Sequence, residues 1–154
     1  MVRKKTLWKV PVFCVVAGII AYYLIVSILG RFAVVTLPDG SISINSTKSL
    51  LISGVLLLAA LLAGKWFLRG MTCKELFFSA SIVVLYGLIL LLVQWAFQLT
   101  TGPAAVWLVY LFRPFEWCSA VGQALFKLTD HLWLSSMLEM FSPYLLIVLG
   151  KKQA

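Results

Sequence analysis

Residues 103–129 read PAAVWLVYLFRPFEWCSAVGQALFKLT, and the arrangement of the whole chain depends on the path of this stretch. A helix needs roughly 20 apolar residues to cross a bilayer, but the apolar run that starts at Pro103 is interrupted after ten residues by Arg113. If a helix crossed here, Arg113 would lie near the bilayer centre, where a charged side chain costs several kcal/mol. We therefore expect residues 103–129 to enter and leave the membrane on one side, as a re-entrant or kinked hairpin.

The second half of this stretch has the pattern of an amphipathic helix. Pro114 suits the first position of a helix and Glu116 suits its first turn, so a new helix is expected to start at Pro114. Glu116, Ser119, Gln123 and Lys127 follow one another at steps of three or four residues, with apolar residues between them. This spacing predicts an interfacial helix whose polar side faces water.

The rest of the chain divides into apolar runs that are long enough to cross a membrane. Of the 154 residues, 62% are hydrophobic and only 12% are charged, with a mean hydropathy of +1.03. Soluble domains carry about twice that share of charge, so an ordinary soluble domain is excluded. The sequence predicts an all-α integral membrane protein with a single membrane domain, 1–154. Its four transmembrane helices are expected at about 10–29, 49–68, 75–98 and 132–149.

The basic residues mark one side of this predicted bundle. Lys and Arg number 13 against 5 Asp and Glu, and they gather beside the apolar runs: Arg3, Lys4 and Lys5, then residues 65–74, then Lys151 and Lys152. Cytoplasmic flanks of membrane helices carry such an excess. We therefore expect a multi-pass protein of the cell membrane, of the bacterial inner-membrane type, with both termini cytoplasmic. A fifth crossing would move the C-terminal lysines to the other side. Because the charges have this topological role, a nucleic-acid partner is not expected.

Residues 31–48 form the one sizeable polar loop between two predicted helices. Short β-prone runs flank the tetrapeptide LPDG at 37–40, which is typical of a hairpin turn. We expect a short extracytoplasmic β-hairpin-like loop that leans on the membrane surface or on a partner, since an isolated two-stranded hairpin is marginally stable. Asn45 is placed to cap the second helix, and Thr72 with Glu75 has the pattern of a capping box for the third.

Glu139 is the main candidate for a functional group inside a predicted span. Ionisable side chains are costly there and indicate binding sites by default, and Ser135, Ser136 and Ser142 are spaced to lie near it. Two interpretations stand. Either this patch binds a cation, a proton or a lipid headgroup, or a protonated Glu139 hydrogen-bonds another helix as a packing contact. Gln94, near the end of the third helix, presents the same choice between lining a polar cavity and bonding a neighbouring helix.

Arg113 and Glu116 form a second candidate site at the turn of the re-entrant segment. Their i, i+3 spacing allows an interfacial ion pair that helps a helix to start, and the alternative is a clamp for an anion or lipid headgroup outside the membrane. Asp130 is expected to cap the last helix, with His131 at headgroup depth. The three cysteines are widely spaced, and no catalytic, metal-binding or cofactor motif is apparent.

The sequence favours a non-catalytic role. The leading hypothesis is a small subunit or scaffold that acts through helix packing, with the bilayer and a second copy or another membrane protein as its partners. The first alternative is an oligomeric transporter or channel-like protein for a small solute, ion or lipid that uses Glu139. The second alternative is a membrane enzyme acting on lipid at the outer interface. It requires Arg113 and Glu116 to converge with the Asp130-His131 pair on one reacting site.

Overall fold

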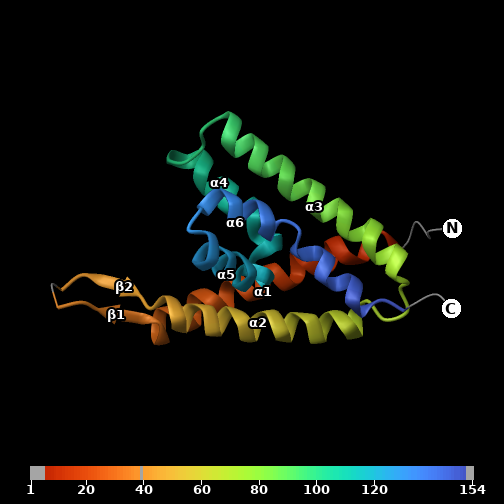
Figure 1. Ribbon diagram of the computed structural model, residues 1–154, viewed down its shortest axis with the longest axis horizontal. Coiled ribbons are helices and arrows are strands. Elements are labelled where there is room, and N and C mark those ends of the chain that lie inside the picture. The colour runs from red at the N-terminus through yellow and green to blue at the C-terminus, as the bar shows by residue number, and fades with distance from the viewer. Residues whose placement is uncertain (1–5, 39, 152–154) are drawn as a thin grey trace.

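The computed structural model describes residues 6–38 and 40–151, which form a bundle of helices with one small sheet (Figure 1). Predictions that rest on Arg3, Lys4, Lys5, Asp39 and Lys152 lie outside these ranges. In chain order the elements are α1 (Lys9–Phe32), β1 (Val34–Thr36), β2 (Ile42–Ile44), α2 (Ser46–Phe67), α3 (Cys73–Ala96), α4 (Gly102–Phe112), η2 (Arg113–Cys118), α5 (Ser119–Thr129), α6 (Leu132–Glu139) and η3 (Ser142–Leu149).

The helical class and the number of spans agree with the prediction. Within the described ranges, four segments are long and apolar enough to cross a membrane: Lys9–Ile28, Ser46–Phe67, Cys73–Ala96 and Leu132–Leu149. Each overlaps one of the four runs that the sequence predicts, with starts shifted by at most a few residues. The chain is therefore a helical protein with four apolar helices of membrane-spanning length.

Two of these helices start where local capping signals predict. The Asn45 Oδ1 accepts hydrogen bonds from the N–H groups of Thr47 at 3.1 Å and Lys48 at 3.0 Å. At the start of α3, the Thr72 hydroxyl accepts from the Glu75 N–H at 3.3 Å, and the Glu75 carboxylate accepts from the Thr72 N–H at 3.1 Å. Both predicted caps are confirmed.

Strands β1 and β2 form the predicted hairpin, which projects beyond the bundle at the end opposite the termini (Figure 1). They pair antiparallel, with Val34 opposite Ile44. The Gly40 N–H donates to the Leu37 carbonyl at 2.9 Å, and Gly40 has a φ of 81°, which a residue without a Cβ adopts at little steric cost. Val34, Ile44 and Ile42 are all exposed, so the hairpin contributes little to the core.

Residues 102–129 turn back on themselves inside the bundle. α4 leads in from the hairpin end, and α5 leads back toward it (Figure 1). Between them, η2 packs against the middle of α1 because Gly18 has no side chain: a Cβ there would lie 2.9 Å from the Arg113 carbonyl carbon and 3.0 Å from the Pro114 Cα. Pro114 stops α4 from continuing, since its nitrogen cannot donate to the carbonyl four residues earlier.

α5 differs from the predicted interfacial helix. Ala120 and Gly122 are buried, and Gln123 is joined to α2. The Gln123 Oε1 accepts from the Ser49 hydroxyl at 3.1 Å, and its Nε2 donates to the Ser53 hydroxyl at 3.0 Å. The expectation that the Gln123 side of this helix faces water is wrong, because polar partners inside the bundle satisfy it instead.

The last span is not one continuous helix. α6 ends at Glu139 and η3 begins at Ser142. Pro143 lies in the first turn of η3, where its missing N–H interrupts the α-helical hydrogen bonds. The two halves together still run toward the end that carries the termini (Figure 1), where the Lys151 N–H donates to the Met71 carbonyl at 3.1 Å.

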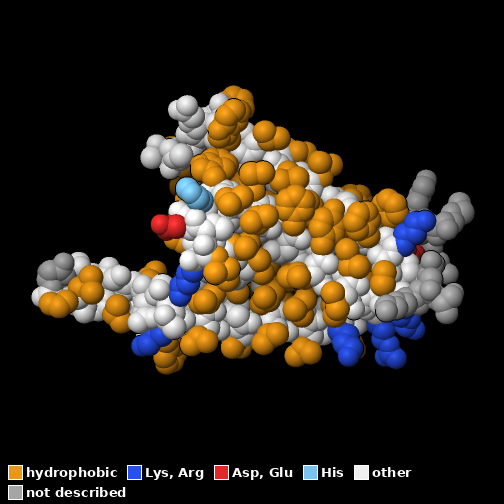
Figure 2. Space-filling model, viewed as in Figure 1, with side chains coloured by type: hydrophobic (Ala, Val, Ile, Leu, Met, Phe, Trp, Pro, Cys, Tyr) orange, Lys and Arg blue, Asp and Glu red, His pale blue; other side chains and the backbone are white. Residues whose placement is uncertain are grey.

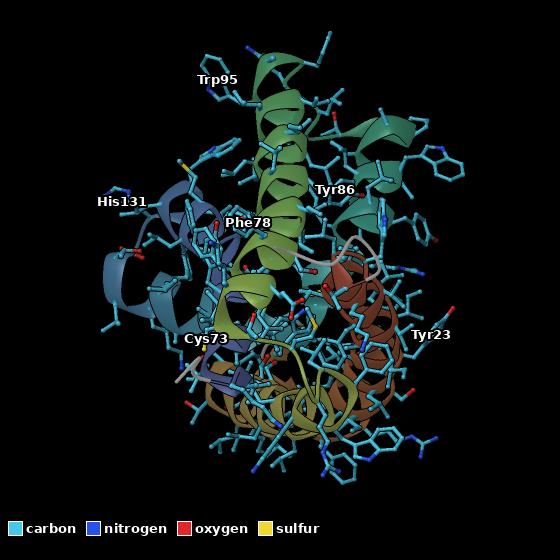
Figure 3. All side chains as sticks on the ribbon, turned by 90° about the vertical axis from the view of Figure 1, so that its right-hand side faces the viewer. Tyr23, Cys73, Phe78, Tyr86, Trp95 and His131 are labelled. Carbon is cyan, nitrogen blue, oxygen red and sulfur yellow. The ribbon has the colours of Figure 1, made fainter. Side chains whose placement is uncertain are left out.

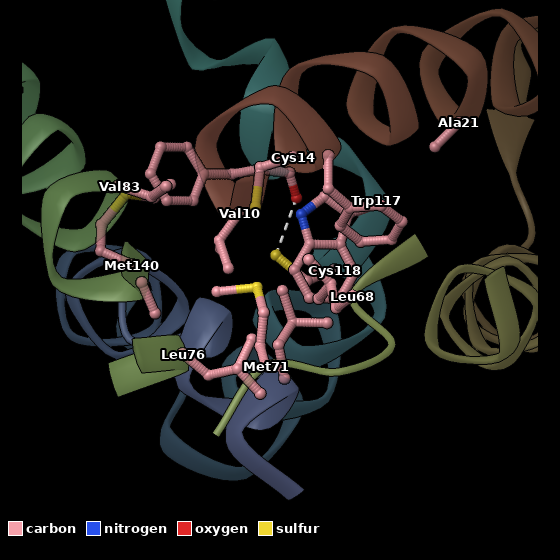
Figure 4. Packing of buried hydrophobic residues seen from close by; sticks show 14 of the residues in the cluster. Val10, Cys14, Ala21, Leu68, Met71, Leu76, Val83, Trp117, Cys118 and Met140 are labelled. Atoms are coloured by element: carbon pink, nitrogen blue, oxygen red, sulfur yellow. Dashed lines mark hydrogen bonds between the residues drawn. The ribbon is translucent and has the colours of Figure 1, made fainter. Parts of the chain in front are cut away.

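The core lies between η2 and the end of the bundle that carries the termini. Trp117 of η2 is fully buried, and its ring centre lies 6.2 Å from that of Phe13. Figure 4 shows Trp117 beside Cys14 of α1 and Leu68 of the turn after α2. This cluster holds η2 against both α1 and the α2–α3 connection.

Basic side chains gather at the end with the termini (Figure 2). Lys65 lies in the last turn of α2 and Lys74 in the first turn of α3, and Lys151 follows η3. Lys48 and Lys127 belong to the hairpin end, at the start of α2 and near the end of α5.

Candidate functional site

Glu116, Glu139 and Gln94 line one cavity between α3, η2, α5 and α6, in the half of the bundle nearer the hairpin. Its volume is about 410 Å³. Apolar side chains supply most of the remaining wall: Leu91, Phe112, Phe115, Phe126, Leu132 and Met140. The structure therefore brings three of the predicted binding residues together and places the fourth, Arg113, elsewhere.

The Glu139 carboxyl group occupies space that Gly122 leaves open in α5. A Cβ on Gly122 would lie 2.6 Å from the Glu139 Cδ and would overlap one of its oxygens. Glycine inside a helix costs about 1 kcal/mol relative to alanine, so this position needs a compensating reason, and the carboxyl group supplies one. Because Gly122 falls among the residues between the polar positions of this helix, its role is not evident from their spacing. An interior glycine in an amphipathic helix was the available signal.

Glu116 reaches the same cavity from η2. It is half-buried, and it lies near enough to Glu139 for the two carboxyl groups to repel each other when both are ionised. Two carboxyl groups around one small cavity therefore favour a positive charge, or a proton, between them.

Two further polar side chains of α5 line this cavity, Ser119 and Gln123. The Ser119 Oγ is buried and has no hydrogen-bond partner in the part of the chain that the structure describes. Gln123 is fixed by its two hydrogen bonds to α2. Their spacing from Glu116 was the signal for both, but the sequence assigned that polar side to water.

Ser135 and Ser136 of α6 complete the polar lining. The Ser135 hydroxyl donates within its own helix, to the carbonyls of His131 and Leu132 at 2.9 Å each, which leaves its oxygen free to accept. Among the described residues, no group of three His, Cys, Asp or Glu side chains is placed to hold a metal ion. Carboxylate, amide and hydroxyl oxygens dominate the polar part of the wall, and such oxygens suit hard cations or ammonium groups.

Arg113 lies on another side of η2, against α1 and α4. Its guanidinium carbon is 4.1 Å from the ring centres of both Tyr22 and Tyr110. The backbone of Arg113 lies beside Gly18, near the middle of α1, and its guanidinium lies beside Tyr22. Cation–π attraction to the two rings offsets part of the cost of this position. Glu116 is close enough to attract the guanidinium, but its carboxyl group lines the cavity beside Glu139.

Asp130 and His131 lie apart from both groups. Asp130 ends α5 with a φ of 53°, and the His131 side chain makes no capping hydrogen bond to α6. The prediction that Asp130 caps the last helix is therefore wrong, because Asp130 serves as the left-handed residue that terminates the preceding one. Figure 3 shows His131 on one side of α3, and Tyr86 and Tyr23 on the other. Glu116 lines the cavity beside Glu139, whereas Arg113, Asp130 and His131 do not line it.

Comparison of the chain with protein-family models, with curated protein sequences and with solved structures finds no match. The fold alone defines the class: a helical protein with four apolar helices long enough to cross a membrane, as in a multi-pass membrane protein. A closer assignment has to come from the chemistry of the cavities.

Proposed function

We propose that the chain binds a small cation in the cavity lined by Glu116 and Glu139, as the substrate site of an oligomeric transporter or channel-like protein. The observation that supports this is the convergence of two carboxyl groups, from η2 and α6, on one small cavity in which Gly122 leaves room for one of them. The packing interpretation of Glu139 needs a partner on another helix, whereas its carboxyl group faces a cavity with further oxygen ligands.

The proposal also includes the orientation of the helices in the membrane. With the end that carries Lys65, Lys74 and Lys151 on the cytoplasmic side, the hairpin is extracytoplasmic. Residues 103–129 are then a re-entrant segment entered from outside, and the cavity lies in the outer half of the bundle. Carboxyl groups at such depth are rare and are found along ion and proton pathways. Four spans are few for an independent transporter, so several copies are expected to assemble.

Ion flux into proteoliposomes that contain the full chain tests the proposal. Na⁺, K⁺ and H⁺ are each driven by a gradient, and Glu139→Gln and Glu116→Gln are compared with the wild type. Glutamine keeps the volume and removes the charge. Because each carboxylate contributes one of two negative charges in a poorly solvated site, either change should lower the flux of the transported ion about tenfold or more.

Asp130→Asn is the matched control. It makes the same carboxylate-to-amide change at an exposed position outside the cavity, and asparagine tolerates the positive φ found there. Its flux should equal that of the wild type. Undiminished flux of all three ions in Glu139→Gln contradicts the proposal, as does an equal loss in Asp130→Asn, which would indicate a general surface-charge effect.

A second candidate is a structural subunit that assembles with a second copy of the chain. The hairpin favours it: Val34, Ile42 and Ile44 lie on one face of a two-stranded ribbon and are 38%, 75% and 56% exposed. Such a ribbon is marginally stable without a cover. Native mass spectrometry of the detergent-solubilised chain should show a dimer or higher oligomer that Ile42→Ser with Ile44→Ser shifts toward monomer. A strictly monomeric wild type contradicts this candidate.

A further inference from the structure

The guanidinium of Arg113 is held between aromatic rings, away from the acidic cavity. Its carbon atom lies 4.1 Å from the ring centre of Tyr22 on α1 and 4.1 Å from that of Tyr110 on α4. Cation–π attraction of this kind holds a positive charge in place without supplying a counter-ion. The two rings therefore position the group between two helices, and neither ring neutralises its charge.

A cation–π contact involves the charge of the guanidinium and uses none of its hydrogen-bonding groups. The guanidinium has five N–H donors and no acceptor. The Arg113 Nε is buried and has no hydrogen-bond partner within residues 6–38 and 40–151. A buried donor without an acceptor is costly, so an acceptor from outside the chain would stabilise this arrangement.

A cavity of about 230 Å³ adjoins Arg113. Besides Arg113, its lining consists of Val15, Ile19, Tyr86, Tyr110, Leu111 and Pro114. Val15, Ile19 and Leu111 are 43%, 39% and 44% exposed, so the cavity opens through apolar side chains of the outer surface. The Tyr86 hydroxyl donates to the Leu111 carbonyl at 2.9 Å, which ties α3 to α4 at this wall.

We propose that this cavity binds the phosphate of an anionic lipid, with Arg113 donating to its oxygens. The planar fork of a guanidinium matches two oxygens of one phosphate. The apolar rim of Val15, Ile19 and Leu111 suits the acyl chain beside a headgroup, which favours a lipid over free phosphate. The site uses a different cavity from Glu116 and Glu139, so it does not depend on the proposed cation function.

The position of Arg113 along α1 limits where a bound lipid headgroup can lie. The backbone of Arg113 touches Gly18 near the middle of α1, and its guanidinium lies beside Tyr22, six residues before Ile28, where the span ends. At 1.5 Å per helical residue, a phosphate bound there lies about 9 Å inside that end of the span and so below the headgroup layer. The occupant is therefore a lipid drawn between α1 and α4, and an ordinary lipid of the surrounding layer, with its headgroup at the surface, does not fit this description.

Thermal unfolding of the full chain in detergent, with three added compounds, tests the ligand. Dioctanoyl phosphatidic acid carries the phosphate and the chains, dioctanoylglycerol carries the chains alone, and inorganic phosphate carries the anion alone. A ligand that binds the folded state raises the unfolding midpoint, so only phosphatidic acid should raise it at equal concentrations. An equal rise with dioctanoylglycerol or with inorganic phosphate overturns the assignment to a lipid phosphate.

Substitutions in this cavity test whether its residues bind the lipid. Arg113→Lys keeps the charge and loses the planar fork, and it should weaken phosphatidic acid binding about tenfold. Val15→Phe narrows the mouth of the cavity and leaves Arg113 and its rings intact, so it should weaken binding similarly even if Arg113→Lys folds poorly. The control is Arg69→Lys, at an exposed arginine in the turn after α2. Wild-type affinity in Val15→Phe, or an equal loss in Arg69→Lys, overturns the proposal.

Discussion

Replacement of Gly18 by alanine tests the packing that holds η2 inside the bundle. The added Cβ would lie 2.9 Å from the Arg113 carbonyl carbon and 3.0 Å from the Pro114 Cα, and would overlap the Arg113 carbonyl oxygen. Non-bonded carbon atoms pack at about 3.5–4.0 Å, so α1 and η2 must separate by roughly 1 Å. All three contacts are with backbone atoms, so no side-chain rotation relieves them.

This separation should destabilise the fold. Overpacking a core position costs about 1–3 kcal/mol, and the buried rings of Phe115 and Trp117, which η2 carries, lose dispersion contacts when η2 moves. Alanine in place of glycine returns up to about 1 kcal/mol of helix propensity. We expect a net loss of about 2 kcal/mol, which lowers the unfolding midpoint by roughly 4–8 °C for a chain of this length.

The thiols of Cys14 and Cys118 provide the readout, because both are buried in the folded chain. A thiol-reactive fluorescent dye labels them as the protein unfolds, so heating the full chain in detergent with the dye gives the midpoint. Gly54→Ala is the matched control, since a Cβ on Gly54 in α2 meets nothing within 4 Å. Its midpoint should equal or exceed that of the wild type. A Gly18→Ala midpoint at or above the wild-type value refutes the close contact between α1 and η2.

Three further substitutions separate stability from binding, with the midpoint measured in the same way. Gly122→Ala should keep or raise the unfolding midpoint, because the atoms that its Cβ displaces belong to the flexible end of Glu139. Cation flux should fall to the level of Glu139→Gln. Unchanged flux contradicts the role given to Gly122. Gln123→Leu should lower stability by about 1–3 kcal/mol by leaving the buried Ser53 hydroxyl without its partner, and a wild-type midpoint would count against that pairing. Thr72→Ala should cost about 1 kcal/mol through loss of the cap, and Thr72→Ser should restore most of it.

The spans, the caps of α2 and α3 and the hairpin are predictable because each depends on residues close together in the chain. Asn45 caps N–H groups two and three residues ahead, and the Thr72–Glu75 box closes over three residues. The length of an apolar run is likewise a property of the sequence alone. These features need no knowledge of what packs against them.

The direction of the polar side of α5 is not predictable in this way. An amphipathic pattern indicates that one side of a helix is polar, but water and a set of polar groups inside the bundle satisfy that side equally well. Ser49 and Ser53 are the polar groups inside the bundle that bond Gln123, and they lie 74 and 70 residues from it in the chain. The cavity could therefore be found only after α5 was placed beside α2 and α6.

The aromatic partners of Arg113 were missed for a related reason. The cost that keeps an arginine out of the membrane applies to an isolated charge, whereas Tyr22 and Tyr110 supply ring faces from two different helices. Tyr110 is three residues away and was visible in the sequence, but Tyr22 comes from α1. A rule that treats each charge alone cannot anticipate a partner brought in by the fold.

η2 carries two charged residues, Arg113 and Glu116, which are half-buried and line two different cavities. Arg113 and Glu116 are close enough to attract each other, and this attraction lowers the cost of holding both in a region of low dielectric. A direct bidentate ion pair would satisfy the charges more fully, but it would also occupy the donors and acceptors that a ligand needs. Here the guanidinium and the carboxyl group line separate cavities. When both groups are ionised their charges offset each other, while each group keeps hydrogen-bonding capacity for a partner of opposite charge.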